Sequence, residues 1–262
     1  MSYRFIRTEK GPLDGPFLNE FNLQVCIPST DVWDASFAMS LLQMQMQLFE
    51  THVGKRTYFN VNNRLGSMLS LNREELILNA LEVEPKITHI LMLDSDMCFP
   101  ADTAHWLAWR NEPIVLANYV KRVIPTLPVT RGMDGHLLAT LDTSTGLQPV
   151  KYGGLGVCMV HREVFEKIPR PWFHFEWYET KAGKLAMRGE DVYFFDKARA
   201  AGYDVLVDHD LSKHVTHRGA FEYTHRMAFL DEDEDTFDAE GRYTPEVKLE
   251  KLREAANEKS AA

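Results

Sequence analysis

The sequence lacks any long apolar run. None of its hydrophobic stretches approaches the roughly 20 residues that a membrane-spanning helix requires. Its first residues, MSYRFIRTEKGPLDG, lack the apolar core of a secretory signal. We therefore expect a cytoplasmic protein without a membrane span.

Cysteine is scarce, and so are the usual signatures of metal hydrolases. The three cysteines, Cys26, Cys98 and Cys158, lie in or beside apolar stretches without the paired spacing of a metal site, so we expect buried free thiols. No HExxH-type spacing appears, which disfavours a metal hydrolase built on His209, His214 and His217.

Basic residues are outnumbered, but the excess of acid is local. The net charge is −9, and the 12 acidic and 6 basic residues from Phe221 onward account for −6 of it, which leaves −3 for residues 1–220. A nearly neutral body can still carry a basic groove. The candidates are Lys55, Arg56, Arg64, Arg73, Lys121, Arg122 and Arg131.

Strand-like and helix-like segments alternate along most of the chain. The strand patterns lie at 23–29, 57–61, 90–93 and 114–119. The helical patterns between them lie at 33–50, 67–82 and 101–110. This alternation predicts an α/β fold with a mainly parallel sheet flanked by helices, formed by one domain over residues 1–220. An acidic tail with a polar helix would follow at 221–262, and this C-terminal region is a candidate for self-association.

Several segments carry more specific expectations. In the helix at 33–50, Met39, Leu42, Met46 and Phe49 recur at helical spacing, so we expect them in the core. Residues 123–148 predict a β-rich region at the edge of the site, with a strand-like piece at 136–141. The polar stretch 176–188 indicates a mobile loop, and 190–201 predicts a helix followed by a last strand at 203–207.

Two carboxylates end the apolar run 90–93. Asp94 and Asp96, with Ser95 between them, can turn to one side of the chain, and a divalent cation would compensate their charges. Oxygen ligands suit Mg²⁺ or Mn²⁺ with substrate phosphates completing the shell. Because ligands gather at the carboxyl ends of parallel strands, segments 28–31, 62–64 and 94–96 should share one crevice.

A second acidic pair, Glu190 and Asp191, follows Gly189 at the start of a predicted helix. Acids at this position favour the helix dipole without any further function. Three histidines, His209, His214 and His217, follow the last predicted strand.

In this order, the DSD at 94–96, the GED at 189–191 and a histidine after the following strand resemble nucleotide-sugar glycosyltransferases of the GT-A fold. The likeness is greatest to family 2-type proteins of bacteriophages and bacteria, and a phage protein of this kind would act in the host cytoplasm. It extends over about residues 24–219, through LNREELILNAL, THILMLDSDMCFP, IVLANYVKR, GLGVCMVHREVFEKI and RGEDVYFFDKARAAGYDV.

The resemblance implies a role for each matching residue. Asp94 and Asp96 would hold Mn²⁺ or Mg²⁺ on the diphosphate of the donor, a UDP-sugar above all, and His214 would be a further metal ligand with His217 as the alternative. Asp191 would accept the proton of the acceptor hydroxyl, positioned by Glu190, with inversion of configuration. The remaining donor-binding residues would be Pro28, Ser29, Thr30, Asn63 and Arg73, with Asp94 also contacting the ribose or sugar side.

Other functions stay open at this point. A nucleotidyltransferase also uses paired acids, although IPSTDVWDAS lacks the glycine- and basic-rich loop typical of such enzymes, and a non-catalytic nucleotide-sugar-binding subunit is a third reading. The acceptor could be a glycan, a protein, a small molecule or a hydroxymethylated pyrimidine in DNA. The aromatic residues Trp172, Phe173, Phe175, Trp177 and Tyr178 could stack on a sugar or a base, or pack a structural corner. The basic residues Lys181, Lys184 and Arg188 follow them.

Overall fold

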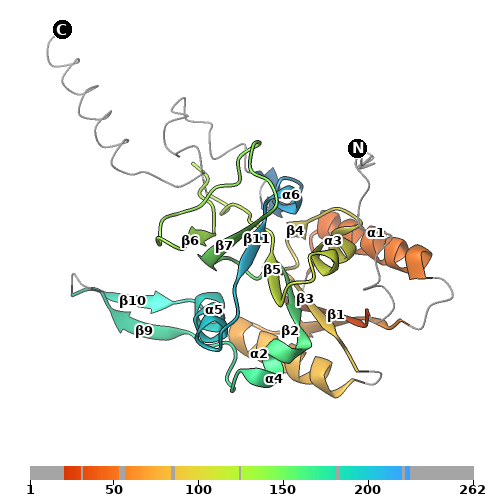
Figure 1. Ribbon diagram of the computed structural model, residues 1–262, viewed down its shortest axis with the longest axis horizontal. Coiled ribbons are helices and arrows are strands. Elements are labelled where there is room, and N and C mark those ends of the chain that lie inside the picture. Colours follow the sequence, from red (N-terminus) through yellow and green to blue (C-terminus); the bar gives the residue numbers. More distant parts are fainter. Residues whose placement is uncertain are drawn as a thin grey trace, which may run out of the picture.

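A central eight-stranded sheet organises the computed structural model, which describes residues 21–30, 32–52, 57–83, 86–123, 125–180, 183–219 and 222–224 (Figure 1). The strand order is β2-β1-β3-β8-β5-β11-β7-β6. In chain order these strands are β1 (Leu23–Ser29), β2 (Phe59–Leu65), β3 (His89–Leu93), β5 (Ile114–Leu116), β6 (Arg131–Gly132), β7 (Leu147–Tyr152), β8 (Val157–His161) and β11 (Leu206–Asp208).

Most strands of this sheet run in one direction. β1 is parallel to β2 and β3, and β5 is parallel to β11, whereas β8 lies antiparallel between β3 and β5, and β7 is antiparallel to β11 and β6. The predicted α/β class and the largely parallel sheet are therefore confirmed. The antiparallel insertion of β8 carries the glycine-rich segment 153–156 back to the end of β3.

Helices cover both faces of the sheet, as Figure 1 shows. They are α1 (Ala35–His52), α2 (Leu69–Glu82), α3 (Thr103–Trp109), α4 (Arg162–Lys167), α5 (Glu190–Ala200) and α6 (His209–Ser212). α1 and α3 share one hydrophobic core with Val25 and Ile27 of β1, and α2, α4 and α5 share the other core with Cys26. Alternate residues of β1 thus face opposite layers, as the two-residue period of a strand requires.

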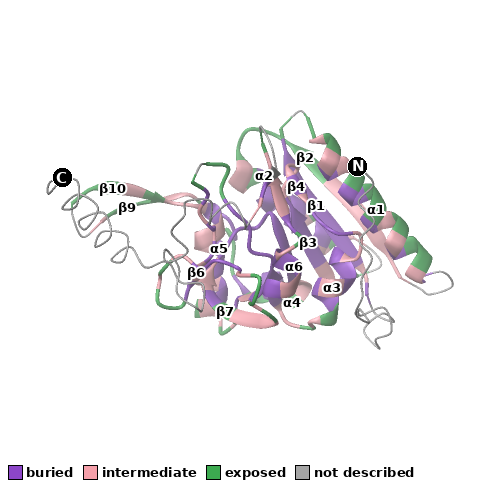
Figure 2. Cartoon of the chain, turned by 90° about the horizontal axis from the view of Figure 1, so that it is seen from above, coloured by how far each residue is buried: buried purple, intermediate pink, exposed green. Residues whose placement is uncertain are grey.

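The apolar stripe of α1 lies on the side opposite to the predicted one. Met39, Leu42, Met46 and Phe49 are exposed, and the residues that face the sheet are Phe37, Leu41, Met44 and Leu48 (Figure 2). Both sets recur at three- and four-residue spacing, so helical periodicity alone cannot distinguish them. The prediction for Met39, Leu42, Met46 and Phe49 is therefore wrong.

Two methionines one half-turn apart in α1 test this assignment. Met44 is fully buried and Met46 is 54% exposed. We expect Met44→Ala to lower the free energy of unfolding by about 2–5 kcal/mol, because it removes buried methylenes and leaves a cavity. Met46→Ala should change it by less than about 0.5 kcal/mol. Urea denaturation of both variants measures the difference, and an equal loss in the two would contradict the observed orientation of α1.

The segment expected to be a mobile loop forms an antiparallel hairpin over its described residues. β9 (Glu176–Glu179) pairs with β10 (Leu185–Arg188), with Trp177 opposite Met187. Arg188 ties the hairpin to α5 through Asp196, at 3.5 Å. At 136–141, where a strand-like piece was predicted, Leu137 forms an isolated bridge with Arg131.

Three short strands form a separate small sheet near the end of β3. β12 (Thr216–Arg218) lies between β4 (Met97–Cys98) and β13 (Glu222–Tyr223), antiparallel to both. The rest of the predicted tail and its helix lie outside the described residues, so the boundary at 221 stays a prediction. In the part of the chain that the structure describes, no helix combines the length and apolarity needed to cross a membrane.

Candidate active site

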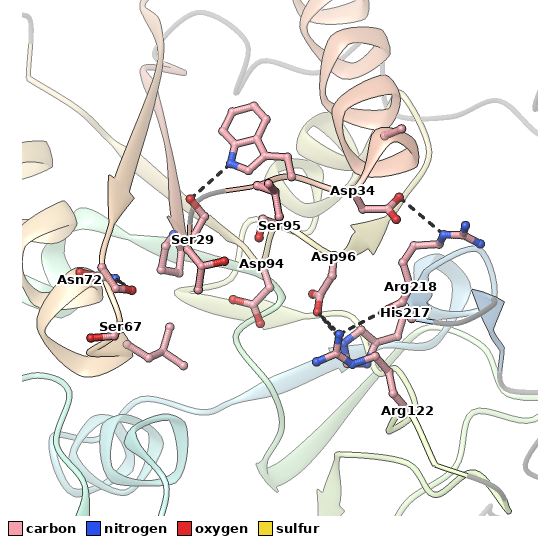
Figure 3. Close-up of a pocket in the computed structure, with 18 residues that line it drawn as sticks. Ser29, Asp34, Ser67, Asn72, Asp94, Ser95, Asp96, Arg122, His217 and Arg218 are labelled. Carbon is pink, nitrogen blue, oxygen red and sulfur yellow. Dashed lines mark hydrogen bonds and ion pairs between the residues drawn. The ribbon is translucent and has the colours of Figure 1, made fainter.

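A cavity of about 830 Å³ opens at the carboxyl ends of β1, β2 and β3 (Figure 3). Two of the three segments predicted to share one crevice line this cavity, and the third, 62–64, does not. Pro28, Ser29 and Thr30 after β1, and Asp94, Ser95 and Asp96 after β3, line the wall. After β2 the lining residues are Gly66 and Ser67, because β2 continues through 62–64.

Asn63 supports the cavity wall from behind. It lies within β2 opposite Ile27, and its Oδ1 accepts a hydrogen bond of 2.6 Å from the hydroxyl of Ser29. The same hydroxyl accepts a hydrogen bond of 3.3 Å from Nε1 of Trp33. Asn63 therefore orients Ser29 and Trp33, and Trp33 lines the cavity.

Asp96 has two basic partners on one carboxylate oxygen. Its Oδ2 lies 2.8 Å from Nη1 of Arg122 and 3.3 Å from Nε2 of His217. Burial raises the pKa of Asp96, but the hydrogen bond and charge of His217 and the charge of Arg122 outweigh it, so the pKa lies below its usual value. Asp96 is therefore a carboxylate at neutral pH.

His217 faces Asp96, whereas His214 is exposed and does not line the cavity. The pairing of β12 with β4 sets His217 opposite Met97, and the backbone N–H of Arg218 donates to the carbonyl of Asp96 at 2.7 Å. Nδ1 of His217 lies 2.9 Å from the carbonyl of Val120, which can only accept a hydrogen bond. Nδ1 therefore carries a proton, and Nε2 faces Oδ2 of Asp96.

Asp96 and His217 are candidate ligands for a divalent cation. Metal-binding histidines commonly donate their second ring N–H to a carbonyl or carboxylate, as His217 does to Val120. Within the described segments, no group of three or more histidine, cysteine or acidic side chains lies close enough together to hold a metal ion. An ion on Asp96 and His217 would therefore need further ligands from a substrate, as is usual for Mg²⁺ and Mn²⁺ on phosphates.

Arg73 lies behind Asp94 and does not line the cavity. It belongs to α2 and is only 2% exposed, with Nη2 at 2.6 Å from Oδ1 of Asp94 and Nε at 3.4 Å from Oε1 of Glu190. Asp94 and Glu190, 96 positions apart in the sequence, are thus joined by one buried guanidinium. The contacts of Arg73 are with these two acids, so it fixes the position of Asp94 at the end of β3.

Asp191 occupies the first turn of α5, beside this cluster. Burial, and then the charge of Glu190, raise its pKa from 3.8 to about 6, although the N–H of Val192 and the charge of Arg73 oppose the rise. A Cβ on Gly189 would lie 2.7 Å from Oδ1 of Asp191, so a larger residue here would displace this carboxylate. Asp191 does not line the cavity, but it interacts electrostatically with Asp94 and Tyr119. A carboxylate with this pKa can act as a general base near neutral pH.

The glycine cluster at 153–156 packs against Tyr119 and Asp94. A Cβ on Gly154 would lie 2.0 Å from the hydroxyl oxygen of Tyr119, so no side chain fits at this position. These glycines let β8 approach the end of β3, where the carbonyl of Gly156 accepts a hydrogen bond of 3.0 Å from the N–H of Asp94.

The cavity residues that were not predicted from the sequence include Trp33, Asp34, Ser67 and Arg218. Trp33 and Asp34 were assigned to the first helix, but α1 begins at Ala35 and the N–H of Ser36 donates to Asp34 at 2.8 Å. An aspartate directly before a helix is a capping signal, and it would have placed both residues in the loop after β1.

The other candidate residues divide between the site and the scaffold. Trp172 and Phe173 are buried, so they form a structural corner, whereas Trp177 and Tyr178 are exposed on the hairpin. Among the candidates for a basic groove, Arg64 pairs with Glu75 and Arg131 bonds the carbonyl of Gly135. His209 is buried and bonds Thr140 and Gln148. Lys55, Arg56 and Lys181 lie outside the described residues.

Comparisons with known proteins agree with this fold. No family model and no curated protein matches the chain. Among solved structures, A197 from STIV matches with a TM-score of 0.52 and 19% identity, over 76% of this chain and 86% of A197. The chain shares the fold of A197.

Two further solved structures are more distant. The catalytic domain of Drosophila β1,4-galactosyltransferase 7, in complex with xylobiose, has a TM-score of 0.40 and 15% identity, over 72% of this chain and 65% of that domain. A glycosyltransferase involved in glycosylation of the major capsid of PBCV-1 has a TM-score of 0.28 and 15% identity, over 58% of this chain and 68% of its own. With TM-scores below 0.5, neither adds to the fold assignment.

Proposed function

We propose that the chain is a metal-dependent glycosyltransferase that moves a sugar from a nucleoside-diphosphate sugar to an acceptor hydroxyl. The observation that carries this proposal is the pairing of Asp96 with His217 at the wall of a cavity that Asp94 also lines, beside a second acidic group at Asp191. Asp94 and Asp96 suit the binding of a cation and a diphosphate, and Asp191 suits proton transfer.

Asp94, Asp96 and His217 would hold Mn²⁺ or Mg²⁺, with Mn²⁺ favoured by the nitrogen ligand. When bound, the cation would act as a Lewis acid on the diphosphate that leaves the sugar. Pro28, Ser29 and Thr30 would border the nucleobase and ribose, and UDP is the nucleotide we propose first. Arg73 would keep Asp94 in place from behind.

Asp191 would accept the proton of the acceptor hydroxyl as its oxygen forms a bond to the anomeric carbon. The bond from that carbon to the diphosphate oxygen breaks in the same step. Attack from the face opposite to the leaving group inverts the configuration, so we propose an inverting enzyme. Glu190, which forms an ion pair with Arg73, would help to hold the start of α5 in position.

The ion pairs of the site disfavour modified DNA as the acceptor. Three of the cations expected in a basic groove, Arg64, Arg73 and Arg122, are neutralised by Glu75, Asp94 and Asp96. Binding to DNA depends on free cations that contact phosphates. An acceptor screen that contains both glycans and hydroxymethylated DNA would separate these two classes.

The first test is a thermal-shift panel of UDP-, GDP-, CMP- and dTDP-sugars, each with and without Mn²⁺. We expect one donor to raise the melting temperature, and only when the cation is present, since a ligand that binds the folded state stabilises it by mass action. A shift with free nucleoside triphosphates and metal, but with no nucleotide sugar, would contradict the proposal and favour nucleotidyl transfer.

A further inference from the structure

Arg122 enters the cavity from a short loop after β5. The loop is held by a backbone hydrogen bond of 2.8 Å from Lys121 to Leu127 and by a bridge between Val120 and Pro128. The side chain of Arg122 is 49% exposed and lines the cavity wall opposite Ser29 and Ser67, as Figure 3 shows. Its backbone is therefore fixed, while its guanidinium faces the space that a ligand would use.

The guanidinium has two partners, and both belong to the site. Nη1 lies 2.8 Å from Oδ2 of Asp96 and donates a hydrogen bond of 3.3 Å to the carbonyl of Arg218. The aliphatic part of the side chain passes Gly219, where a Cβ would lie 3.1 Å from Cδ of Arg122. Gly219 thus leaves room for the stem of Arg122 beside β12.

Arg122 and His217 contact the same oxygen of Asp96. A divalent cation that binds Asp96 and His217 would lie within a few ångströms of this guanidinium. Like charges at such a distance repel strongly in a partly buried site. Arg122 and the cation therefore compete for Asp96, and the half-exposed side chain of Arg122 is the group that can move.

A diphosphate gives the displaced guanidinium a new partner. The donor would approach the cation from the cavity, and its phosphate oxygens would be the nearest negative charges that the cation does not fully neutralise. The planar guanidinium of arginine matches phosphate oxygens with two parallel hydrogen bonds, which lysine cannot reproduce.

We propose that Arg122 exchanges its ion pair with Asp96 for an ion pair with the donor diphosphate when the cation binds. This inference rests on the proposed function, and it makes Arg122 a donor-binding residue that also opposes binding of the cation alone. Cation and nucleotide then bind cooperatively, because each removes an interaction that disfavours the other. When the diphosphate leaves, the return of Arg122 to Asp96 would help to release the cation.

The experiment compares Arg122→Ala and Arg122→Lys with the wild type, using Lys121→Ala as the matched control. Lys121 is exposed, adjacent in sequence and equal in charge, and it does not line the cavity. Mn²⁺ binding is measured by the electron paramagnetic resonance signal of the free ion, without nucleotide. UDP binding is measured by calorimetry at saturating Mn²⁺, and thermal unfolding shows that each variant is folded.

We expect opposite changes in the two affinities. Arg122→Ala should bind Mn²⁺ alone at least about fivefold more tightly and UDP at least about tenfold more weakly, and Arg122→Lys should lie between it and the wild type. Lys121→Ala should change each affinity less than twofold. A purely structural role for Arg122 would weaken both.

Two results would overturn the inference. Mn²⁺ affinity that stays equal or falls in Arg122→Ala would contradict the competition for Asp96, and unchanged UDP affinity would contradict the contact with the diphosphate. Failure of the proposed function looks different. In that case the wild type binds no nucleoside diphosphate with any cation, whereas the Mn²⁺ measurement still reports on the pair of Arg122 with Asp96.

Discussion

Asp191→Asn is expected to lower the turnover of sugar transfer by about 100- to 10,000-fold, the usual contribution of a general base. The amide keeps the shape of the side chain and can still accept the hydrogen bond of 2.7 Å from the N–H of Val192. Donor binding should therefore change little, since Asp191 does not line the cavity at the ends of β1, β2 and β3. A radiolabelled-donor transfer assay, combined with calorimetric donor binding, measures both effects.

Asp196→Asn is the control for this variant, because it removes the same charge from the same helix. Asp196 pairs with Arg188 of the hairpin and should be dispensable for turnover. If Asp191→Asn retained more than a tenth of wild-type turnover, another group would have to accept the proton.

The pH dependence follows from the same carboxyl group. Its pKa of about 6 means that the base form is present above this pH and is lost as the pH falls through it. The kcat/KM of the wild type should therefore rise with pH through about 6 and then level off, and Asp191→Asn should lack this rise.

As the pH rises through about 6, the contribution of Asp191 to stability should fall while activity rises. Because the folded-state pKa of Asp191 is raised, ionisation costs the folded protein free energy as the pH rises from 3.8 toward 6. Above pH 6, Asp191→Asn should be as stable as the wild type or more stable, by up to about 3 kcal/mol. A lower melting temperature of the variant at pH 7.5 would contradict the cause assigned to the shift.

Asp96→Asn is expected to weaken cation-dependent binding of the donor by about 100-fold or more. Loss of a group that only supports a metal ligand costs about 10- to 100-fold in metal affinity, so loss of a ligand itself should cost at least as much. Calorimetric titration of UDP with and without Mn²⁺ measures the effect. Binding that does not require the cation should be unaffected.

Asp204→Asn serves as the control for Asp96→Asn. Asp204 is exposed, lies outside the cavity and precedes β11. A loss of less than threefold in Asp96→Asn, with a folded variant, would show that Asp96 is not a metal ligand. The pairing with Arg122 and His217 would then be structural.

Much of the fold was predictable from local patterns. Short apolar runs between helical patterns located β1, β2, β3 and β5 and predicted that most strands of the sheet would be parallel. The antiparallel entry of β8 and the hairpin β9–β10 were not predicted. The apolar sequence of β8 does not indicate in which direction the strand runs in the sheet. The polar sequence of β9 and β10 carries no strong strand signal.

The chemistry of the site was more predictable than its geometry. Asp94, Asp96 and Asp191 stand out as acids at the ends of apolar or helical segments. Asp94 and Asp96 line the cavity and the pKa of Asp191 is raised, while the roles assigned to the three acids stay predictions. Arg73 was expected to face the donor, and it is buried behind Asp94 because α2 packs against β1.

The sequence by itself determined the α/β alternation, the acidic pairs and the set of histidines from which a ligand could come, because periodicity and residue type are local properties. Only the tertiary structure decided that His217 faces Asp96, since the register of β12 against β4 fixes which side chains face the cavity. In the same way, packing of α1 against the sheet buries the stripe that contains Met44 and leaves the stripe that contains Met46 exposed. Local periodicity is the same for both stripes, and packing against β1 distinguishes them.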